Sequence, residues 1–164
     1  MLSAPKIIVR DDQPFAAIRI ELNRLDIPML APPLIGEVAA WLERRGIKPA
    51  GAPFFSYTGM GPGERLEMEV GFPTAEQVQA DGRVIAGIIP RGRFATLRYT
   101  GPYVGLYEAN MALGEWLAAQ GESPGGGSAP GRYAAAHLEI YETDPATEPD
   151  PGRWITDVLF RLGD

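Results

Sequence analysis

A single carboxylate, Glu139, stands inside the largely apolar stretch AAAHLEIY at residues 134–141. If this stretch is a β-strand, its alternation directs His137, Glu139 and Tyr141 to one face of a sheet. A carboxylate in such a strand either faces solvent or is buried, and a buried one requires a partner or acquires a raised pKa. Taken alone, the pattern favours the solvent-facing position. If Glu139 is instead buried among aromatic rings, it can select a cation by its charge and by cation–π attraction.

Aromatic side chains are numerous enough to form the walls of a ligand site around such a carboxylate. Tyrosine suits a wall because its ring packs against a ligand while its hydroxyl finds a polar partner. The aromatic candidates for ligand contact are Tyr141, Tyr57, Phe55, Tyr103, Tyr107 and Trp154. Two further tryptophans, Trp41 and Trp116, fall on the apolar stripes of predicted helices, and we expect them in the core.

Three other side chains could take part in proton transfer. Glu69 and Asp157 lie on predicted strands, and two carboxylates near one cavity could act as acid and base. The sequence favours the simpler interpretation that they pair with nearby arginines, namely Arg19, Arg65 or Arg98. His137 could pair with Glu139 and titrate near neutral pH, although a lone strand histidine more often has an ordinary structural partner or is exposed.

The composition excludes several kinds of site. The chain has one histidine and no cysteine, which rules out multi-histidine and cysteine-based metal sites, and we predict no metal. The glycine run at 125–127 lacks the Lys-Ser/Thr that follows a phosphate-binding loop, and we predict no cofactor.

The bulk properties are those of one folded domain over residues 1–164, with 45% apolar and 22% charged residues. A formal net charge of −6, with no dense cluster of lysine and arginine, opposes contact with phosphate backbones, so we expect no nucleic-acid partner. No apolar run approaches the ~20 residues that cross a bilayer, and the N-terminus lacks the layout of a signal peptide. We therefore expect a cytoplasmic protein without membrane association.

Hydrophobic spacing in the first half predicts a strand, a helix and two more strands. Residues 15–21 form the first strand. From Leu34 the apolar residues recur at helical spacing, and Gly46 ends that helix as a C′ glycine does. The stripe consists of Leu34, Val38, Trp41 and Leu42. The later strands, 53–58 and 65–72, are joined by a hairpin-like loop at 59–63.

The same order recurs in the second half of the chain. A strand at 94–98 echoes residues 15–19, and a helix follows Gly101-Pro102. The stripe of this helix is Leu106, Leu113, Trp116 and Leu117. Three matches share an offset of 75 residues, namely Trp116-Leu117 with Trp41-Leu42, Gly121 with Gly46, and Pro124 with Pro49. Tyr141 with Tyr57 and Phe160 with Phe72 follow at larger offsets, because the second half has longer loops at 121–131 and 144–153.

These matches predict an internal duplication, with repeat 1 over about 15–73 and repeat 2 over about 93–162. The predicted fold class is α+β: duplicated β-α-β-β units form an antiparallel sheet with helices on one face and a cleft between the copies. Residues 84–89 and 93–99 are predicted to form an extra hairpin around Pro90-Arg91-Gly92.

Four stretches of the sequence resemble the GyrI-like family, which also supplies the effector-binding domains of AraC- and MerR-type transcription regulators. They are EVGFP at 69–73, PRGRFA at 90–95, YTGPY at 99–103 with LGEWL at 113–117, and LEIY at 138–141 continuing through Asp144-Pro145 to WITD at 154–157. The resemblance extends from about residue 5 to residue 162. It rests on the order and spacing of the pieces and not on any one of them.

The resemblance implies a cleft between the two copies, lined with aromatic rings, in which a buried glutamate meets lipophilic and often cationic compounds. The family glutamate falls on Glu139, which makes the buried position the preferred one. No helix-turn-helix precedes residue 15, so we expect a stand-alone domain and not a complete transcription factor. Asp157 stands where many relatives carry glutamate.

Two functions from different classes follow. The first is a stand-alone protein that binds or sequesters lipophilic, cationic aromatic compounds, including drugs. The second is a hydrolase of reactive lipophilic natural products, as some stand-alone relatives are, in which Glu139 would act with Tyr141, Tyr103 or Trp154. A protein partner, as in the topoisomerase inhibition that gave the family its name, is a third hypothesis that no feature of the sequence supports.

Overall fold

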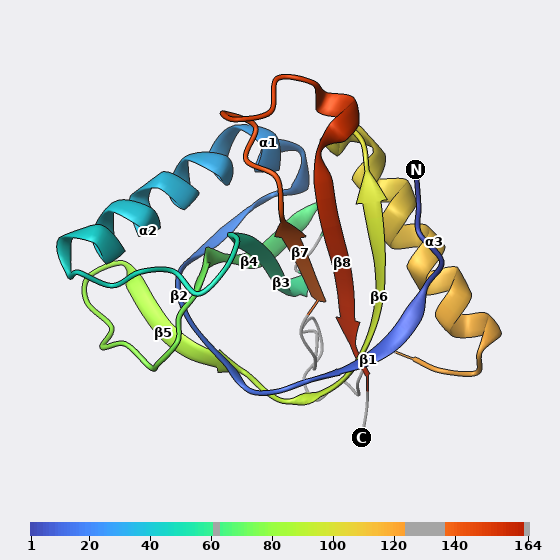
Figure 1. Ribbon diagram of the computed structural model, residues 1–164, viewed down its shortest axis with the longest axis horizontal. Helices are drawn as coiled ribbons and strands as arrows, with labels where there is room; N and C mark the ends of the chain where they lie inside the picture. Colours follow the sequence, from blue (N-terminus) through green and yellow to red (C-terminus); the bar gives the residue numbers. More distant parts are fainter. Residues whose placement is uncertain (61–62, 124–136, 163–164) are drawn as a thin grey trace.

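The computed structural model describes residues 1–60, 63–123 and 137–162, so the glycine run at 125–127 and residues 134–136 lie outside the described part. Within that part the chain forms an eight-stranded antiparallel sheet and three α-helices (Figure 1). The strands are β1 (Lys6–Arg10), β2 (Gln13–Asn23), β3 (Phe54–Met60), β4 (Arg65–Pro73), β5 (Val84–Ile89), β6 (Gly92–Thr100), β7 (His137–Tyr141) and β8 (Ile155–Arg161). The helices are α1 (Ile27–Leu30), α2 (Pro32–Arg44) and α3 (Leu106–Ala119), with 3-10 turns η1 (Arg24–Asp26), η2 (Tyr103–Gly105) and η3 (Pro151–Arg153).

The strand order is β1-β6-β8-β7-β3-β4-β2-β5. From the central β3–β7 pair outward, the first copy follows in the order β3, β4, β2 and the second in the equivalent order β7, β8, β6. At that pair, Phe55 is the Cα partner of Glu139. The 84-residue offset that relates Tyr57 to Tyr141 also relates Phe55 to Glu139, so the two copies meet at equivalent positions. The predicted β-α-β-β repeat is therefore present in the fold, while its origin by duplication stays a prediction.

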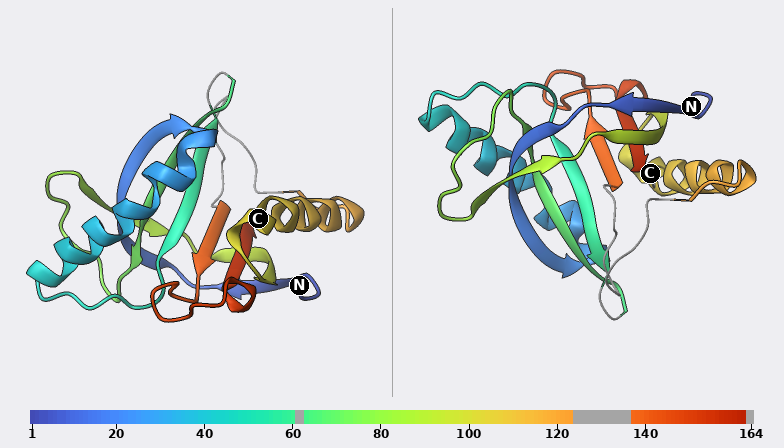
Figure 2. Two further views of the ribbon diagram at one scale, coloured as in Figure 1. Left: turned by 90° about the horizontal axis from the view of Figure 1, so that it is seen from above. Right: turned by 90° about the horizontal axis from the view of Figure 1, so that it is seen from below.

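Both long helices pack against one face of the sheet, as predicted. α2 contacts β2 and β4, and α3 contacts β6 and β8, so each helix covers its own copy. The two helices diverge toward opposite ends of the molecule, with the central strands between them (Figure 2). The buried residues of α2 are the predicted stripe of Leu34, Val38, Trp41 and Leu42. Those of α3 are Leu106, Ala109, Leu113 and Leu117, while Trp116 is only partly buried.

A second apolar cluster fills the opposite face of the sheet. Because side chains alternate along a strand, residues next to the helix-facing ones in sequence form this layer. Its fully buried members include Ala17, Phe94 and Leu138. The sheet thus has two apolar faces, and the helix-facing one contains Glu139.

The predicted hairpin of residues 84–89 with 93–99 is wrong. β5 pairs with β2 at one edge of the sheet, whereas β6 pairs with β1 and β8 near the other. Pro90 and Arg91 carry the chain between them, and the Arg91 amide donates to Asp12 Oδ1 at 2.6 Å, where the β1–β2 connection crosses (Figure 1). β6 pairs with β8 of its own copy. A two-residue link can carry the chain from one side of the sheet to the other as well as it can form a hairpin turn.

No single helix in the described ranges is long and apolar enough to span a membrane. One pair, Arg24–Leu30 with Pro32–Arg44, meets the length and composition criteria together but is bent by 47°.

Two glycines allow a test of how tightly the sheet is packed. A Cβ added to Gly71 in β4 would lie 2.0 Å from the Ala16 carbonyl oxygen and 2.7 Å from Ala17 Cα, and both belong to the backbone of β2. A Cβ added to Gly114 in α3 would meet nothing within 4 Å. In urea unfolding we expect Gly71→Ala to lower stability by on the order of 3 kcal/mol and Gly114→Ala to raise it by about 0.5–1 kcal/mol. A Gly71→Ala protein as stable as the wild type would contradict the packing described for β2 and β4.

Candidate functional site

Glu139 is the central residue of the candidate site. It lies on β7 at the junction with β3, on the face that carries the helices, and only 5% of its surface is exposed. Its neighbour Leu138 points to the opposite apolar layer, which fixes the alternation. The buried position expected from the family resemblance is therefore the one found, and the solvent-facing position that the bare pattern favoured is not.

Three neutral donors hold the Glu139 carboxylate. The Tyr57 and Tyr141 hydroxyls donate to Oε1 at 2.8 and 2.7 Å, and the Asn110 amide donates to Oε2 at 2.9 Å. No lysine or arginine of the described residues lies within ion-pair distance of this carboxylate. Within the described part of the chain, the carboxylate is held by hydrogen bonds from neutral groups and by no ion pair, which is an unusual state for a buried carboxylate.

Asn110 and His137 form a second layer around the carboxylate. The Asn110 amide nitrogen also donates to the Leu106 carbonyl at 2.8 Å, so its oxygen is the atom that faces His137 Nε2 at 2.7 Å. His137 must then carry its proton on Nε2 and donate it to that oxygen. The imidazole ring also contacts Phe160, at 4.3 Å between ring centroids. His137 therefore acts on Glu139 through Asn110 and makes no direct pair with it.

Burial sets the protonation of these groups. It lowers the pKa of His137 to about 4, so the ring is neutral at physiological pH. Burial, followed by the charge of Glu139, raises the pKa of both Tyr57 and Tyr141 well above the ordinary value. Both phenols therefore remain protonated and keep donating to the carboxylate.

Aromatic rings extend from the carboxylate toward the surface. The Tyr141 ring meets Phe55 at 4.8 Å and Tyr103 at 5.5 Å between centroids. Tyr103 in turn lies 4.7 Å from Trp154, whose Nε1 donates to the Glu148 carbonyl. Exposure rises from 9% at Tyr141 to 38% at Tyr103, and Trp154 is half-buried. We call Glu139, Tyr57, Tyr141, Asn110, Phe55, Tyr103 and Trp154 the Glu139 cluster.

The sequence predicted six members of this cluster and missed one. Asn110 was missed, although an amide at the spacing of Leu106 and Leu113 on an apolar helix stripe was the signal that could have revealed it. Tyr107, also predicted, is 57% exposed, and its ring contacts the Arg24 guanidinium, at 4.8 Å, and not the cluster.

The two other predicted carboxylates take the simpler role. Glu69 accepts from Arg19 at 2.8 Å, and Asp157 accepts from Arg98 through two bonds of 2.8 and 2.9 Å. Strand alternation places both acids on the face opposite Glu139, because Met68 and Val158 beside them belong to the helix-facing core. Within the described ranges, no group of three metal-ligating side chains comes together.

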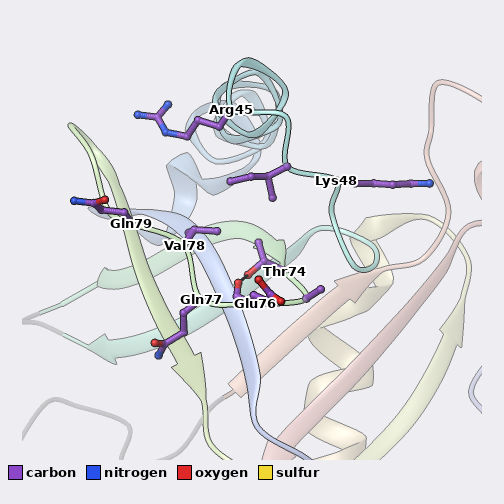
Figure 3. Close-up of a pocket in the computed structure, with 9 residues that line it drawn as sticks. Arg45, Lys48, Thr74, Glu76, Gln77, Val78 and Gln79 are labelled. Carbon is purple, nitrogen blue, oxygen red and sulfur yellow. Dashed lines mark hydrogen bonds between the residues drawn. The ribbon is translucent and has the colours of Figure 1, made fainter.

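A cavity of about 450 Å³ lies away from the cluster, beside the end of α2 (Figure 3). It is lined by Arg45, Ile47, Lys48, Thr74, Ala75, Glu76, Gln77, Val78 and Gln79. Arg45 and Lys48 extend away from each other (Figure 3). Arg45 also pairs with Asp81 and covers the Trp41 ring at 3.9 Å. None of the charged residues that line the cavity is buried, so the Glu139 cluster is the better candidate for a specific site.

Comparison with known proteins gives one family and a set of similar folds. A family model described as the GyrI-like small molecule binding domain matches residues 3–162. No curated protein matches the chain.

Four solved structures, of three different proteins, show how widely the fold is shared. The EcmrR C-terminal domain is 18% identical, with a TM-score of 0.79 and 98% of both chains covered. In the EcmrR–DNA complex, at 17% identity and a TM-score of 0.79, our chain covers 57% of the EcmrR chain and is itself 98% covered. SAV2435 bound to tetraphenylphosphonium is 8% identical, with a TM-score of 0.62 and coverages of 98% and 94%. A hydrolase from Listeria innocua is 12% identical, with a TM-score of 0.63 and coverages of 97% and 91%.

The neutral His137 makes stability depend on pH in a defined window. Unfolded histidine titrates near 6.5, whereas folded His137 titrates at about 4. Between these values the unfolded state binds a proton that the folded state does not, so stability falls as the pH falls, by about 3 kcal/mol in full, and this contribution levels off below pH 4. Urea unfolding from pH 7.5 to 4.5 should show a flatter dependence for His137→Gln than for the wild type. Parallel curves for the two proteins would contradict the burial of the imidazole.

Proposed function

We propose that this chain, which belongs to the GyrI-like family of small-molecule-binding domains, binds lipophilic, cationic aromatic compounds at the Glu139 cluster. The observation that carries the proposal is the buried Glu139 carboxylate, which accepts three hydrogen bonds from neutral donors and has no cationic partner of its own among the described residues. A bound cation would supply the missing countercharge.

The energetics favour a cation with an aromatic or lipophilic body. A buried charge without a countercharge is held at a cost in free energy, which a cation close to Glu139 would relieve. Cation–π attraction to rings such as Tyr141 and Tyr103 adds about 0.5–2 kcal/mol each, more where water is excluded. A strongly hydrated small ion gains less, because it must shed its water to approach these rings.

Glu139 Oε2 is the carboxylate oxygen that could contact a ligand. Oε1 accepts two hydroxyl groups, while Oε2 accepts only the Asn110 amide among the described residues. A carboxylate oxygen has about two lone-pair sites, so Oε2 keeps capacity for a ligand. SAV2435, the similar fold bound to tetraphenylphosphonium, supplies a reasonable probe of the proposed ligand class.

We expect the protein to act as a receptor or sequestering protein in the cytoplasm, without cofactor and without nucleic acid. The net charge of −6 supports the last expectation.

Glu139→Gln tests the proposal. Calorimetric titration with tetraphenylphosphonium should show affinity reduced roughly ten- to a hundredfold, because a charge-assisted contact is lost. A neutral aryl compound such as triphenylphosphine oxide should lose far less. Stability should fall by about 1–3 kcal/mol, since the glutamine side-chain nitrogen would face the Asn110 amide nitrogen and leave a donor without an acceptor.

The matched control is Glu69→Gln, which also removes a buried carboxylate but one paired with Arg19 on the other face. It should leave affinity for the cation unchanged. Equal losses in both variants would mean that Glu139 has no special part in binding.

The second candidate function is a hydrolase of reactive lipophilic natural products. The free capacity of Glu139 Oε2 favours it, because that atom could take a proton from water while Tyr141, Tyr103 or Trp154 assists. In that case mass spectrometry of an electrophilic substrate incubated with the protein should show hydrolysed product. Glu139→Gln would then suppress turnover while leaving substrate binding mostly intact, the reverse of the pattern expected for a binding protein.

A further inference from the structure

The positively charged side chain of Arg24 reaches from the first copy to the second. Arg24 begins η1 directly after β2 of the first copy, and its guanidinium lies 4.8 Å from the centre of the Tyr107 ring on α3 of the second. Its backbone is fixed on both sides: the Arg24 amide donates to the Glu64 carbonyl at 2.7 Å, and Asn23 Oδ1 caps the following turn at Leu25. The side chain therefore starts from a defined place.

Arg24 differs in its partner from the arginines that form ion pairs; like Arg10, which lies over Phe94, it contacts an aromatic ring. Six arginines of the described residues pair with carboxylates, namely Arg19, Arg45, Arg65, Arg83, Arg93 and Arg98. Arg24 has no acidic partner there and rests on an aromatic ring. The cation–π attraction between Arg24 and Tyr107 is the same interaction by which the rings of the Glu139 cluster would hold the proposed ligand.

Arg24 and Tyr107 also lie next to the cluster. Tyr107 precedes Asn110 by three residues on α3, so the two side chains are neighbours on the helix surface, and Asn110 donates to Glu139. The charge of Arg24 also acts on Tyr57, which donates to the same carboxylate. Burial and Glu139 raise the pKa of Tyr57, and Arg24 partly opposes that rise.

We propose that Arg24 is an internal cation that competes with cationic ligands for the Glu139 cluster and so sets the selectivity of the site. The inference rests on the proposed function. With Arg24 on Tyr107, the buried carboxylate has a distant countercharge, and an incoming cation is repelled by the guanidinium. To use Tyr107 the ligand must displace Arg24, and both side chains are exposed, so the displaced guanidinium regains water.

The surroundings of this pair indicate which cations could displace it. Several large apolar side chains a few residues from Arg24 or Tyr107 in the sequence are exposed, namely Leu25, Met29, Leu30, Val104 and Met111. A lipophilic cation gains contact with such side chains when it replaces the guanidinium, whereas a small hydrophilic cation gains nothing to offset the exchange. Arg24 would thereby favour lipophilic over hydrophilic cations.

The test compares Arg24→Gln with the wild type by calorimetric titration of tetraphenylphosphonium. Removing the competing charge should strengthen binding about three- to tenfold, and affinity for neutral triphenylphosphine oxide should stay within about twofold. The matched control is Arg44→Gln at the far end of α2, which makes the same charge change and should leave both affinities unaltered. In a Tyr107→Leu background the effect of Arg24→Gln should fall below about twofold, because the ring that holds the guanidinium is gone.

Each other outcome overturns a distinct claim. If Glu139→Gln weakens binding of the cation but Arg24→Gln leaves it unchanged or weakens it too, Arg24 is no competitor and the proposed function stands. An equal gain in Arg24→Gln and Arg44→Gln would show a general charge effect and also overturn the inference. If the wild type binds no cation at all, the proposed function fails and this inference falls with it.

Discussion

The negative charge of Glu139, buried where the two halves of the sheet meet, is the constraint on which the rest of the site depends. A carboxylate at 5% exposure must be given hydrogen bonds by its surroundings, and neither copy of the repeat supplies enough alone. Tyr57 comes from the first copy, while Tyr141 and Asn110 come from the second. The charge therefore ties the two copies together at the β3–β7 pair, and neighbouring groups adjust to it.

Those adjustments explain features that otherwise look unrelated. Both phenols stay protonated, because burial and the carboxylate charge raise their pKa values. His137 stays neutral and serves to orient the Asn110 amide, so that its nitrogen and not its oxygen meets Glu139. The apparent symmetry of the sheet is broken at its centre: Phe55 occupies in one copy the position that Glu139 occupies in the other. One candidate site of this kind, and not two, follows from that asymmetry.

Sequence patterns sufficed where a local rule decides the outcome. The helix stripes ending in Gly46, the alternation of His137, Glu139 and Tyr141, and the repeated order of elements all appear in the fold. The patterns failed where tertiary partners decide. Residues 84–99 read as a hairpin because a two-residue link satisfies turn rules, yet β5 lies at one edge of the sheet and β6 lies next to the strand at the other edge. Spacing placed Asn110 on the apolar stripe of α3 but did not name Glu139 as its partner, and it gave no sign of the contact between Arg24 and Tyr107, because both contacts join distant segments.

The measurement that tests the central claim most directly is a crystal structure of the complex with tetraphenylphosphonium. The account predicts the phosphonium centre beside the Glu139 carboxylate, with aryl groups against Tyr141, Tyr103 and neighbouring rings, and the hydrogen bonds from Tyr57 and Tyr141 retained. A ligand found instead in the cavity between Arg45 and Gln79, with the Glu139 cluster unchanged, would contradict it. In that case the buried carboxylate would be a structural link between the two copies and not the site of recognition.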